Sequence, residues 1–187
     1  MNTTRRQFLR TAASTIPILF LPELIYASPE KNCKTNNLES DSDEILLARM
    51  IFGEARGQKE LEQIAIGFTP INRANSGLLY LGKTAREAIL KPEQYSCINP
   101  EDKNRKKLLA PMTYEPETFL HCLDIAKKII SRELTDPANA THYFNPSIAK
   151  TPCWAKKIHR IGHLIVAHEN DGTPIYSAHD FYREEKR

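Results

Sequence analysis

One glutamate stands out as a candidate for catalysis. Glu54 ends an apolar run with helical spacing, residues 46–52. A carboxyl group among apolar neighbours resists ionisation, and a retained proton is what a general acid needs. The same glutamate could instead be a helix-end carboxylate in an ion pair with Arg49 or Arg56, which is the competing structural interpretation. The sequence therefore makes Glu54 the leading candidate for an acid–base residue.

The segments that would position Glu54 have helical patterns. Ser42 or Asp43 can cap a helix whose apolar residues recur with roughly helical spacing, which places Glu54 at or just beyond its C-terminal end. A second helical pattern covers residues 61–74. Pro70 is expected to kink this second helix or to split it into two short pieces, because proline cannot donate the backbone hydrogen bond.

The remaining sequence predicts two more helices and then a small β region. Amphipathic patterns predict helices at 84–90 and at 115–134, the latter the longest in the chain. Short runs rich in aromatic and β-branched residues predict strands or extended segments. We therefore predict an α+β fold, a mainly helical single domain with a small C-terminal β region. A charged surface loop is expected at 99–107, and a charged, fraying tail at 180–187. The extended segments are expected at 140–145, 161–167 and 173–177.

The N-terminus has the pattern of an export signal. Arg5 and Arg6 precede Phe8, Leu9 and a short apolar stretch, which resembles a twin-arginine signal read by a receptor. The apolar stretch is interrupted by two prolines and is a poor bilayer-spanning helix, which needs about 20 apolar residues. We expect a signal at 1–27 cleaved after Ala27, with an uncleaved anchor as the alternative. A polar leader at 28–41 and a globular domain at 42–187 would follow, and the twin-arginine machinery would be a partner in transit.

The charge balance argues against a nucleic-acid partner. The full chain carries a formal net charge of +3. Without residues 1–27, Lys+Arg falls to 23 and Asp+Glu to 22, which leaves +1. A near-neutral domain has no electrostatic footprint for nucleic acid. The remaining length and the 41% hydrophobic content fit one ordinary globular domain.

Four cysteines remain after the expected cleavage: Cys33, Cys97, Cys122 and Cys153. In an exported chain they could form two disulfides in any of three connectivities. Twin-arginine substrates generally cross the membrane already folded, so the core should form with reduced thiols. Cys122 lies at an apolar helix position and is equally well explained as a buried free thiol.

Several separated motifs occur in one order along the chain. Together they resemble the cell-wall hydrolase family typified by the catalytic domain of spore-cortex-lytic enzymes, over about residues 45–167. The motifs are residues 47–57 around Glu54, Gln63-Ile64-Ala65, Asn72-Arg73, Gln94-Tyr95-Ser96-Cys97, residues 140–146, Trp154-Ala155 and Arg160-Ile161-Gly162.

The resemblance implies a lysozyme-like domain that acts without cofactor or metal. It implies cleavage of peptidoglycan between N-acetylmuramic acid and N-acetylglucosamine, as a lytic transglycosylase, with Glu54 as the catalytic acid. A hydrolytic muramidase stays open as an alternative. Two departures from the family pattern are Pro70 and the absence of an asparagine between Gly162 and His163. The export signal favours periplasmic peptidoglycan over spore cortex as the substrate.

Seven further residues are candidates for binding the saccharide, because amides, phenols and aromatic faces suit sugar hydroxyl and acetamido groups. Each also has a structural explanation. An ion pair explains the arginine, a turn explains the loop residues, and packing explains the aromatic ones. The candidates are Arg56, Gln94, Tyr95, His142, Tyr143, Asn145 and Trp154.

Two other functions compete with glycan cleavage. Histidines at 159, 163, 168 and 179 suggest a zinc-dependent peptidoglycan amidase. Against zinc, His159 and His163 lie in an expected strand, where four-residue spacing separates side chains by about 13 Å. A non-catalytic peptidoglycan-binding module is the other alternative, and the intact Glu54 argues against it.

Overall fold

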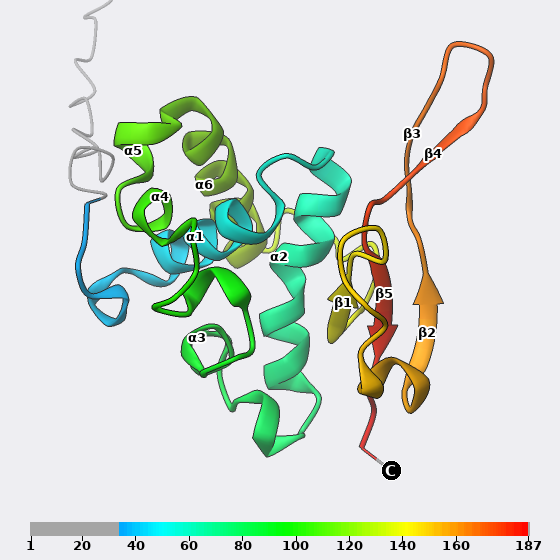
Figure 1. Cartoon of the computed structure of the whole chain (residues 1–187), viewed down its shortest axis with the longest axis horizontal. Helices are drawn as coiled ribbons and strands as arrows, with labels where there is room; N and C mark the ends of the chain where they lie inside the picture. The colour runs from blue at the N-terminus through cyan, green and yellow to red at the C-terminus, as the bar shows by residue number, and fades with distance from the viewer. Residues whose placement is uncertain (1–33, 187) are drawn as a thin grey trace, which may run out of the picture.

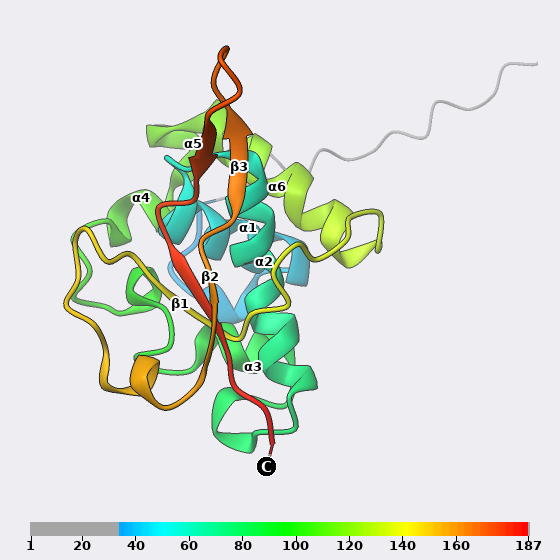
Figure 2. The same ribbon diagram turned by 90° about the vertical axis from the view of Figure 1, so that its right-hand side faces the viewer.

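The computed structural model describes residues 34–186. The predicted export signal, its cleavage site and Cys33 lie outside the described residues. In Figure 1 the helices lie on the left and the strands on the right, with α2 next to the strands. The view turned by 90° shows the strands crossing in front of α2 (Figure 2). The structure therefore confirms the predicted α+β class, mainly helical with a C-terminal β region.

Six α-helices and several 3-10 turns make up the helical part of residues 34–186. None of these helices is long and apolar enough to cross a membrane. The α-helices are α1 (Asp43–Ala55), α2 (Glu60–Asn75), α3 (Ala85–Leu90), α4 (Arg105–Leu109), α5 (Pro111–Tyr114) and α6 (Pro116–Ile130), and the 3-10 turns are Leu38–Ser40, Leu79–Leu81, Ser96–Ile98 and Cys153–Lys156.

Helix α1 is the centre of the core. Ser42 caps it as predicted, because its hydroxyl accepts a hydrogen bond from the N–H of Ile45. Every residue from 46 to 52 is buried, so the helix is enclosed on all sides. Its main partner is α6, against which Phe52 packs edge-on to Phe119 at 5.8 Å between ring centroids. The end of α1 that carries Glu54 is therefore held by packing rather than by a loop.

Helix α2 runs unbroken through Pro70, so the predicted split into two short pieces is wrong. Proline leaves the carbonyl of the residue four positions earlier, Ile66, without its helical donor. The hydroxyl of Thr69 donates to that carbonyl oxygen at 2.7 Å. Since the orphaned acceptor has a substitute donor, the helix continues to Asn75. It is 16 residues long, one more than α6, so the prediction that the 115–134 helix is longest is also wrong.

Two other helix boundaries differ from the predictions. The short helix α4 begins at Arg105, within the surface loop expected at 99–107, and runs beyond it to Leu109, burying Leu108. Helix α6 ends at Ile130, four residues early, because Arg132 adopts a left-handed backbone with φ of 63°. The short helix predicted at 84–90 is present as α3, with Thr84 as its N-cap.

The strands form two small antiparallel sheets in residues 34–186. A three-stranded sheet has the order β1-β5-β2, and a two-stranded hairpin pairs β3 with β4. The predicted fraying tail is wrong, because it contains β5, the central strand of the larger sheet, with Phe181 fully buried. A bulge lies between Arg160 and Gly162, whose φ of 108° suits glycine. The strands are β1 (His142–Phe144), β2 (His159–Gly162), β3 (Ile165–His168), β4 (Pro174–Tyr176) and β5 (Asp180–Arg183).

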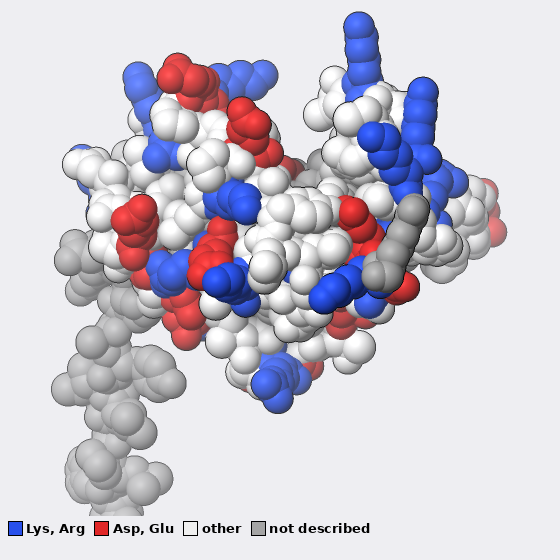
Figure 3. All heavy atoms as spheres, turned by 90° about the horizontal axis from the view of Figure 1, so that it is seen from below, with Lys and Arg blue, Asp and Glu red and all other residues white. Residues whose placement is uncertain are grey.

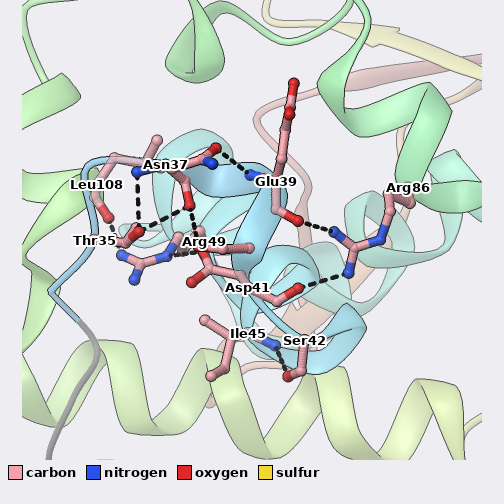
Figure 4. A network of polar contacts seen from close by, with 10 residues as sticks. Thr35, Asn37, Glu39, Asp41, Ser42, Ile45, Arg49, Arg86 and Leu108 are labelled. Atoms are coloured by element: carbon pink, nitrogen blue, oxygen red, sulfur yellow. Dashed lines mark hydrogen bonds and ion pairs between the residues drawn. The ribbon is translucent and has the colours of Figure 1, made fainter.

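Residues 34–41, in the segment expected to be a polar leader, pack against the helices. Leu38 is buried, and the N–H of Thr35 donates to the carbonyl of Leu109. Figure 4 shows the polar network that fixes this segment. Asp41 accepts from the buried Arg49 at 2.7 Å, and Arg86 of α3 donates to the carbonyl oxygen of Asp41. The packed structure therefore begins before the cap of α1.

Candidate active site

The carboxylate of Glu54 is held at the end of α1 by donors from two distant segments. Its Oε1 atom accepts from the backbone N–H of Cys97 at 3.0 Å and from the hydroxyl of Ser96 at 3.2 Å. Its Oε2 atom accepts from the hydroxyl of Tyr143 at 3.2 Å. The two oxygen atoms are thus distinct, since one is held by two donors and the other only by a phenol.

Close packing at Gly53 makes this arrangement possible. A Cβ atom added at Gly53 would lie 2.5 Å from both Cβ and Sγ of Cys97, a separation that real atoms do not adopt. Because residue 53 is glycine, the 96–98 turn approaches the last turn of α1 closely enough for its N–H to reach Glu54. Burial, and then the neighbouring Glu54 carboxylate, raise the pKa of the Cys97 thiol well above its ordinary value. Cys97 is therefore a neutral packing residue.

Tyr143 is positioned from the strand side of the molecule. It lies in β1, opposite Phe181 of the central strand β5. Its ring meets the ring of His179 edge-on at 5.2 Å. His179 is in turn held by Glu62 of α2, whose carboxylate accepts from the His179 N–H at 2.8 Å and contacts its Nδ1 atom at 2.7 Å. The phenol that contacts Glu54 therefore rests on a buried support that reaches back to α2.

Burial and the Glu54 carboxylate raise the pKa of Tyr143 well above its ordinary value. The phenol therefore keeps its proton over the whole physiological range. A protonated hydroxyl remains a hydrogen-bond donor to Oε2 of Glu54.

A cavity of about 390 Å³ opens beside Tyr143. Four predicted binding residues line it, namely Gln94, His142, Tyr143 and Trp154. Arg73, Tyr80 and Glu93 add polar groups to the wall. A cavity with aromatic faces and several separate hydrogen-bonding groups suits a polar, ring-shaped ligand such as a saccharide. Glu54 does not line this cavity directly, and Tyr143 connects the two.

Both arginines near Glu54 have ion-pair partners elsewhere. Arg49 pairs with Asp41, and Arg56 pairs with Glu115 at 3.4 Å and donates to Asn104. Arg56 also lies over the ring of Phe52. In the described residues, Glu54 has no salt bridge to either arginine, so its helix-end position is not explained by an ion pair. The contacts of Arg56 are those of a structural residue.

The other candidates fall into two groups. Tyr95 is buried, with its hydroxyl 3.1 Å from that of Thr69 and the guanidinium of Arg73 over its ring at 4.5 Å, so it lies outside the cavity surface. Asn145 accepts the N–H of Ser147 and caps a turn. By contrast, Trp154 faces the cavity while packing edge-on against Tyr182 at 5.3 Å.

His142 lines the cavity as a neutral base. Burial, and then the nearby Arg73, lower the pKa of His142 from 6.5 to about 4. Its Nδ1 atom lies 2.9 Å from the hydroxyl of Thr141. A neutral imidazole can present its other nitrogen to a ligand as donor or acceptor.

The histidines of the zinc hypothesis do not converge. His163 contacts the carbonyl of Ser177, and His179 contacts Glu62. His159 and His168 are exposed, one in β2 and the other at the end of β3. Within residues 34–186, no three His, Cys, Asp or Glu side chains are placed to hold a metal ion together.

Sequence reasoning missed several residues that build the site. Ser96 holds Glu54, while Glu62 and His179 support Tyr143. Arg73 donates to the carbonyls of Thr141 and Gln94, and so joins α2 to both cavity walls. A polar residue at an otherwise buried helix position, such as Glu62 or Arg73, was the available signal.

A family model described as Cell Wall Hydrolase matches residues 57–167, more than half of the chain. The chain belongs to the cell wall hydrolase family. It is therefore an enzyme of a family that acts on the cell wall, and the predicted family is confirmed. The matched residues include Tyr143 and Trp154 but begin after Glu54. No curated protein sequence matches the chain significantly.

Two solved structures resemble the fold. The catalytic domain of the Bacillus cereus SleB protein is 22% identical with a TM-score of 0.50, over 81% of this chain and 97% of that one. The catalytic domain of the germination-specific lytic transglycosylase SleB from Bacillus anthracis is 20% identical with a TM-score of 0.48, over 76% and 96%. The likeness to the Bacillus cereus domain supports the fold assignment.

Proposed function

We propose that this enzyme cleaves the glycan strands of peptidoglycan between N-acetylmuramic acid and N-acetylglucosamine, as a lytic transglycosylase. The observation that carries the proposal is the carboxylate of Glu54, fixed by three donors next to a saccharide-sized cavity. The match to the cell wall hydrolase family supports action on the same polymer. The proposed setting is the periplasm, reached through the twin-arginine machinery.

Glu54 would act first as an acid and then as a base. Its proton sits best on Oε2, because Oε1 already accepts two hydrogen bonds. Transfer to the bridging oxygen breaks the C1–O bond and leaves positive charge at C1 of the muramic residue. The C6 hydroxyl of the same residue then bonds to C1, and its proton returns to Glu54. The products are a free sugar hydroxyl and a 1,6-anhydromuramic end, and no water is consumed.

The contacts of Glu54 suit this double role. Tyr143 keeps its proton and donates to the carboxylate formed after the first transfer. A second carboxylate is common in glycosidases. Glu62, eight residues after Glu54, is 1% exposed and committed to His179. In this mechanism the acetamido group of the substrate supplies the assistance that a second carboxylate would give.

Glu54→Gln tests the proposal. The amide keeps the shape and an acceptor oxygen but cannot transfer the proton, so digestion of purified peptidoglycan should fall by about 10²–10⁴. Glu117→Gln, the same change at an exposed position of α6, should digest at the parental rate. Full activity in Glu54→Gln would refute the assigned acid.

Mass spectrometry of the products separates the remaining alternatives. Anhydromuropeptides formed in the presence of a chelator support the transglycosylase. Products heavier by one water indicate a muramidase, and chelator-sensitive release of peptides indicates a zinc amidase. Binding without any product indicates a non-catalytic module.

A further inference from the structure

Two hollows lie next to each other beside the candidate active site. The cavity next to Tyr143 shares Lys157, Ile158 and Glu184 with a second, open hollow of about 810 Å³. The second hollow continues past these residues to His159 and Arg183. The two hollows are neighbours on the strand side, and we call them together the strand-side groove. A ligand bound next to Tyr143 can therefore extend away from the reaction centre along this groove.

The segment that walls this groove is basic. Between Pro137 and His168 the chain has four Lys or Arg residues and no Asp or Glu. Lys150, Lys156 and Lys157 are exposed. Seen from below, the surface is notched between its helical and strand sides, and blue Lys and Arg side chains gather on the strand side (Figure 3). The basic character is local, because the chain without its signal is close to neutral.

The three lysines are not neutralised by the protein itself. None of them forms an ion pair with a described residue, whereas Lys107 pairs with Glu115 and Lys128 with Asp124. The fourth basic residue of the segment, Arg160, is paired with Asp180 at 2.8 Å.

Two of the three acidic residues that line the groove have other partners, and the third is Glu93. The carboxylate of Glu184 accepts from the hydroxyl of Tyr80, and Glu185 pairs with Arg183. The ammonium groups of the three lysines are thus available to an anionic ligand.

We propose that Lys157, which lines both hollows, and its exposed chain neighbour Lys156 bind the free carboxylates of peptide stems attached to the glycan strand. The inference rests on the proposed function, since only a glycan strand at Glu54 would bring stems to this groove. The N-acetylated sugar chain itself carries no charge. Each stem leaves the strand sideways from the lactyl group of a muramic residue, and its carboxylates are the natural partners of ammonium groups. The enzyme would accordingly prefer strands that carry peptides.

The test compares two substrates made from one peptidoglycan preparation. Attached phosphate polymers are removed first, so that the stem peptides are the anionic groups compared. One keeps its stem peptides, and the other has been stripped of them by an amidase. The parent enzyme should show a higher kcat/KM on the stem-bearing strands, by roughly three- to tenfold for two exposed ion pairs. The preference should shrink as salt rises, because salt screens exposed charges.

The double variant Lys156→Gln with Lys157→Gln should lose the preference, which is the ratio of its kcat/KM values on the two substrates. The control removes the same charge elsewhere, by Lys83→Gln with Lys127→Gln, both exposed and outside the groove. This control should keep the preference. Equal rates of the parent enzyme on both substrates, or an unchanged preference in the groove variant, would overturn the inference.

The two proposals fail separately. If Glu54→Gln keeps full activity, the proposed function fails whatever the lysines do. If Glu54→Gln is inactive but the parent shows no preference, only the role of the lysines is wrong. Sedimentation of the Glu54→Gln variant with intact and stripped peptidoglycan adds a binding measurement that does not depend on turnover.

Discussion

Nearly all of the buried apolar residues lie on the helical side of the molecule, whereas the β3–β4 hairpin of the strand side has exposed apolar residues. Leu46, Met50 and Phe119 are fully buried around α1. On the strand side, Ile165 and Tyr176 of the β3–β4 hairpin are 48% and 57% exposed. The side that holds Glu54 is therefore rigid, and the side that faces the substrate is supported mainly by one sheet. An acid must be fixed in place, whereas a binding wall can adapt to a bulky polymer.

The largest expected effect contrasts one aromatic residue from each side. Phe119→Ala removes the ring that packs on Phe52 in the helical core, and it should lower the free energy of unfolding by about 3–5 kcal/mol. Tyr176→Ala, the matched truncation in the hairpin, should change it by no more than about 0.5 kcal/mol. Urea unfolding measures both. Equal losses in the two variants would show that both sides contribute equally to the free energy of unfolding.

The second expected effect is a pH dependence of the free energy of unfolding. It is caused by His142, which lies where the two sides meet. The pKa of His142 is lowered to about 4 by burial and by Arg73, while the unfolded chain has the usual 6.5. Between pH 6.5 and pH 4, His142 is protonated in the unfolded chain but stays neutral in the folded protein. The stability contributed by neutral His142 is thus fully present above pH 6.5 and is lost as the pH falls to 4. The loss is at most about 3 kcal/mol.

Urea unfolding at several pH values between 4 and 7 checks this expectation. His142→Gln should flatten the profile over that window, because the substituted side chain does not titrate. His168→Gln changes an exposed histidine and should keep the parental slope. A slope that survives in His142→Gln would assign the acid sensitivity to other groups.

Local patterns predicted the helical side better than the strand side. The cap at Ser42, the buried run of α1 and the position of Glu54 all follow from residues close together in sequence. Pro70 was misjudged because its compensation, the Thr69 hydroxyl, depends on a rotamer rather than on a pattern. The tail was misjudged because charged residues flank Phe181 and Tyr182 on both sides, and the burial of these two aromatic residues depends on pairing with β1.

Residues of the candidate site could be predicted where they stand out from their neighbours in the sequence or are rare in the chain. Glu54 closes an apolar run, and Trp154 is the sole tryptophan. Tyr95 was predicted to lie in a loop, but it is buried. Its ring contacts the guanidinium of Arg73 and its hydroxyl contacts that of Thr69, and both partners lie in α2. Glu62 was unusual as a polar residue in a buried helix, but its partner could not be predicted, because His179 is 117 residues away. Long-range polar pairs of this kind set the limit of sequence reasoning here.

The smallest expected effect tests whether α2 supports the strand side through Glu62. Glu62→Gln replaces one acceptor oxygen by an amide N–H₂, which would face the backbone N–H of Ala178 or the His179 group that the carboxylate now holds. A buried donor without an acceptor costs about 1–3 kcal/mol.

The same substitution should affect catalysis. Because His179 supports Tyr143 edge-on, the phenol should also shift relative to Glu54. We therefore expect kcat to fall roughly tenfold with little change in KM, as for a misplaced group near the reacting atoms. Glu60→Gln, two residues earlier at the exposed start of the same helix, should leave both stability and kcat unchanged. If Glu62→Gln behaved like Glu60→Gln, Tyr143 would be held by β1 and β5 alone, and the strand side would be more independent of the helices than its contacts indicate.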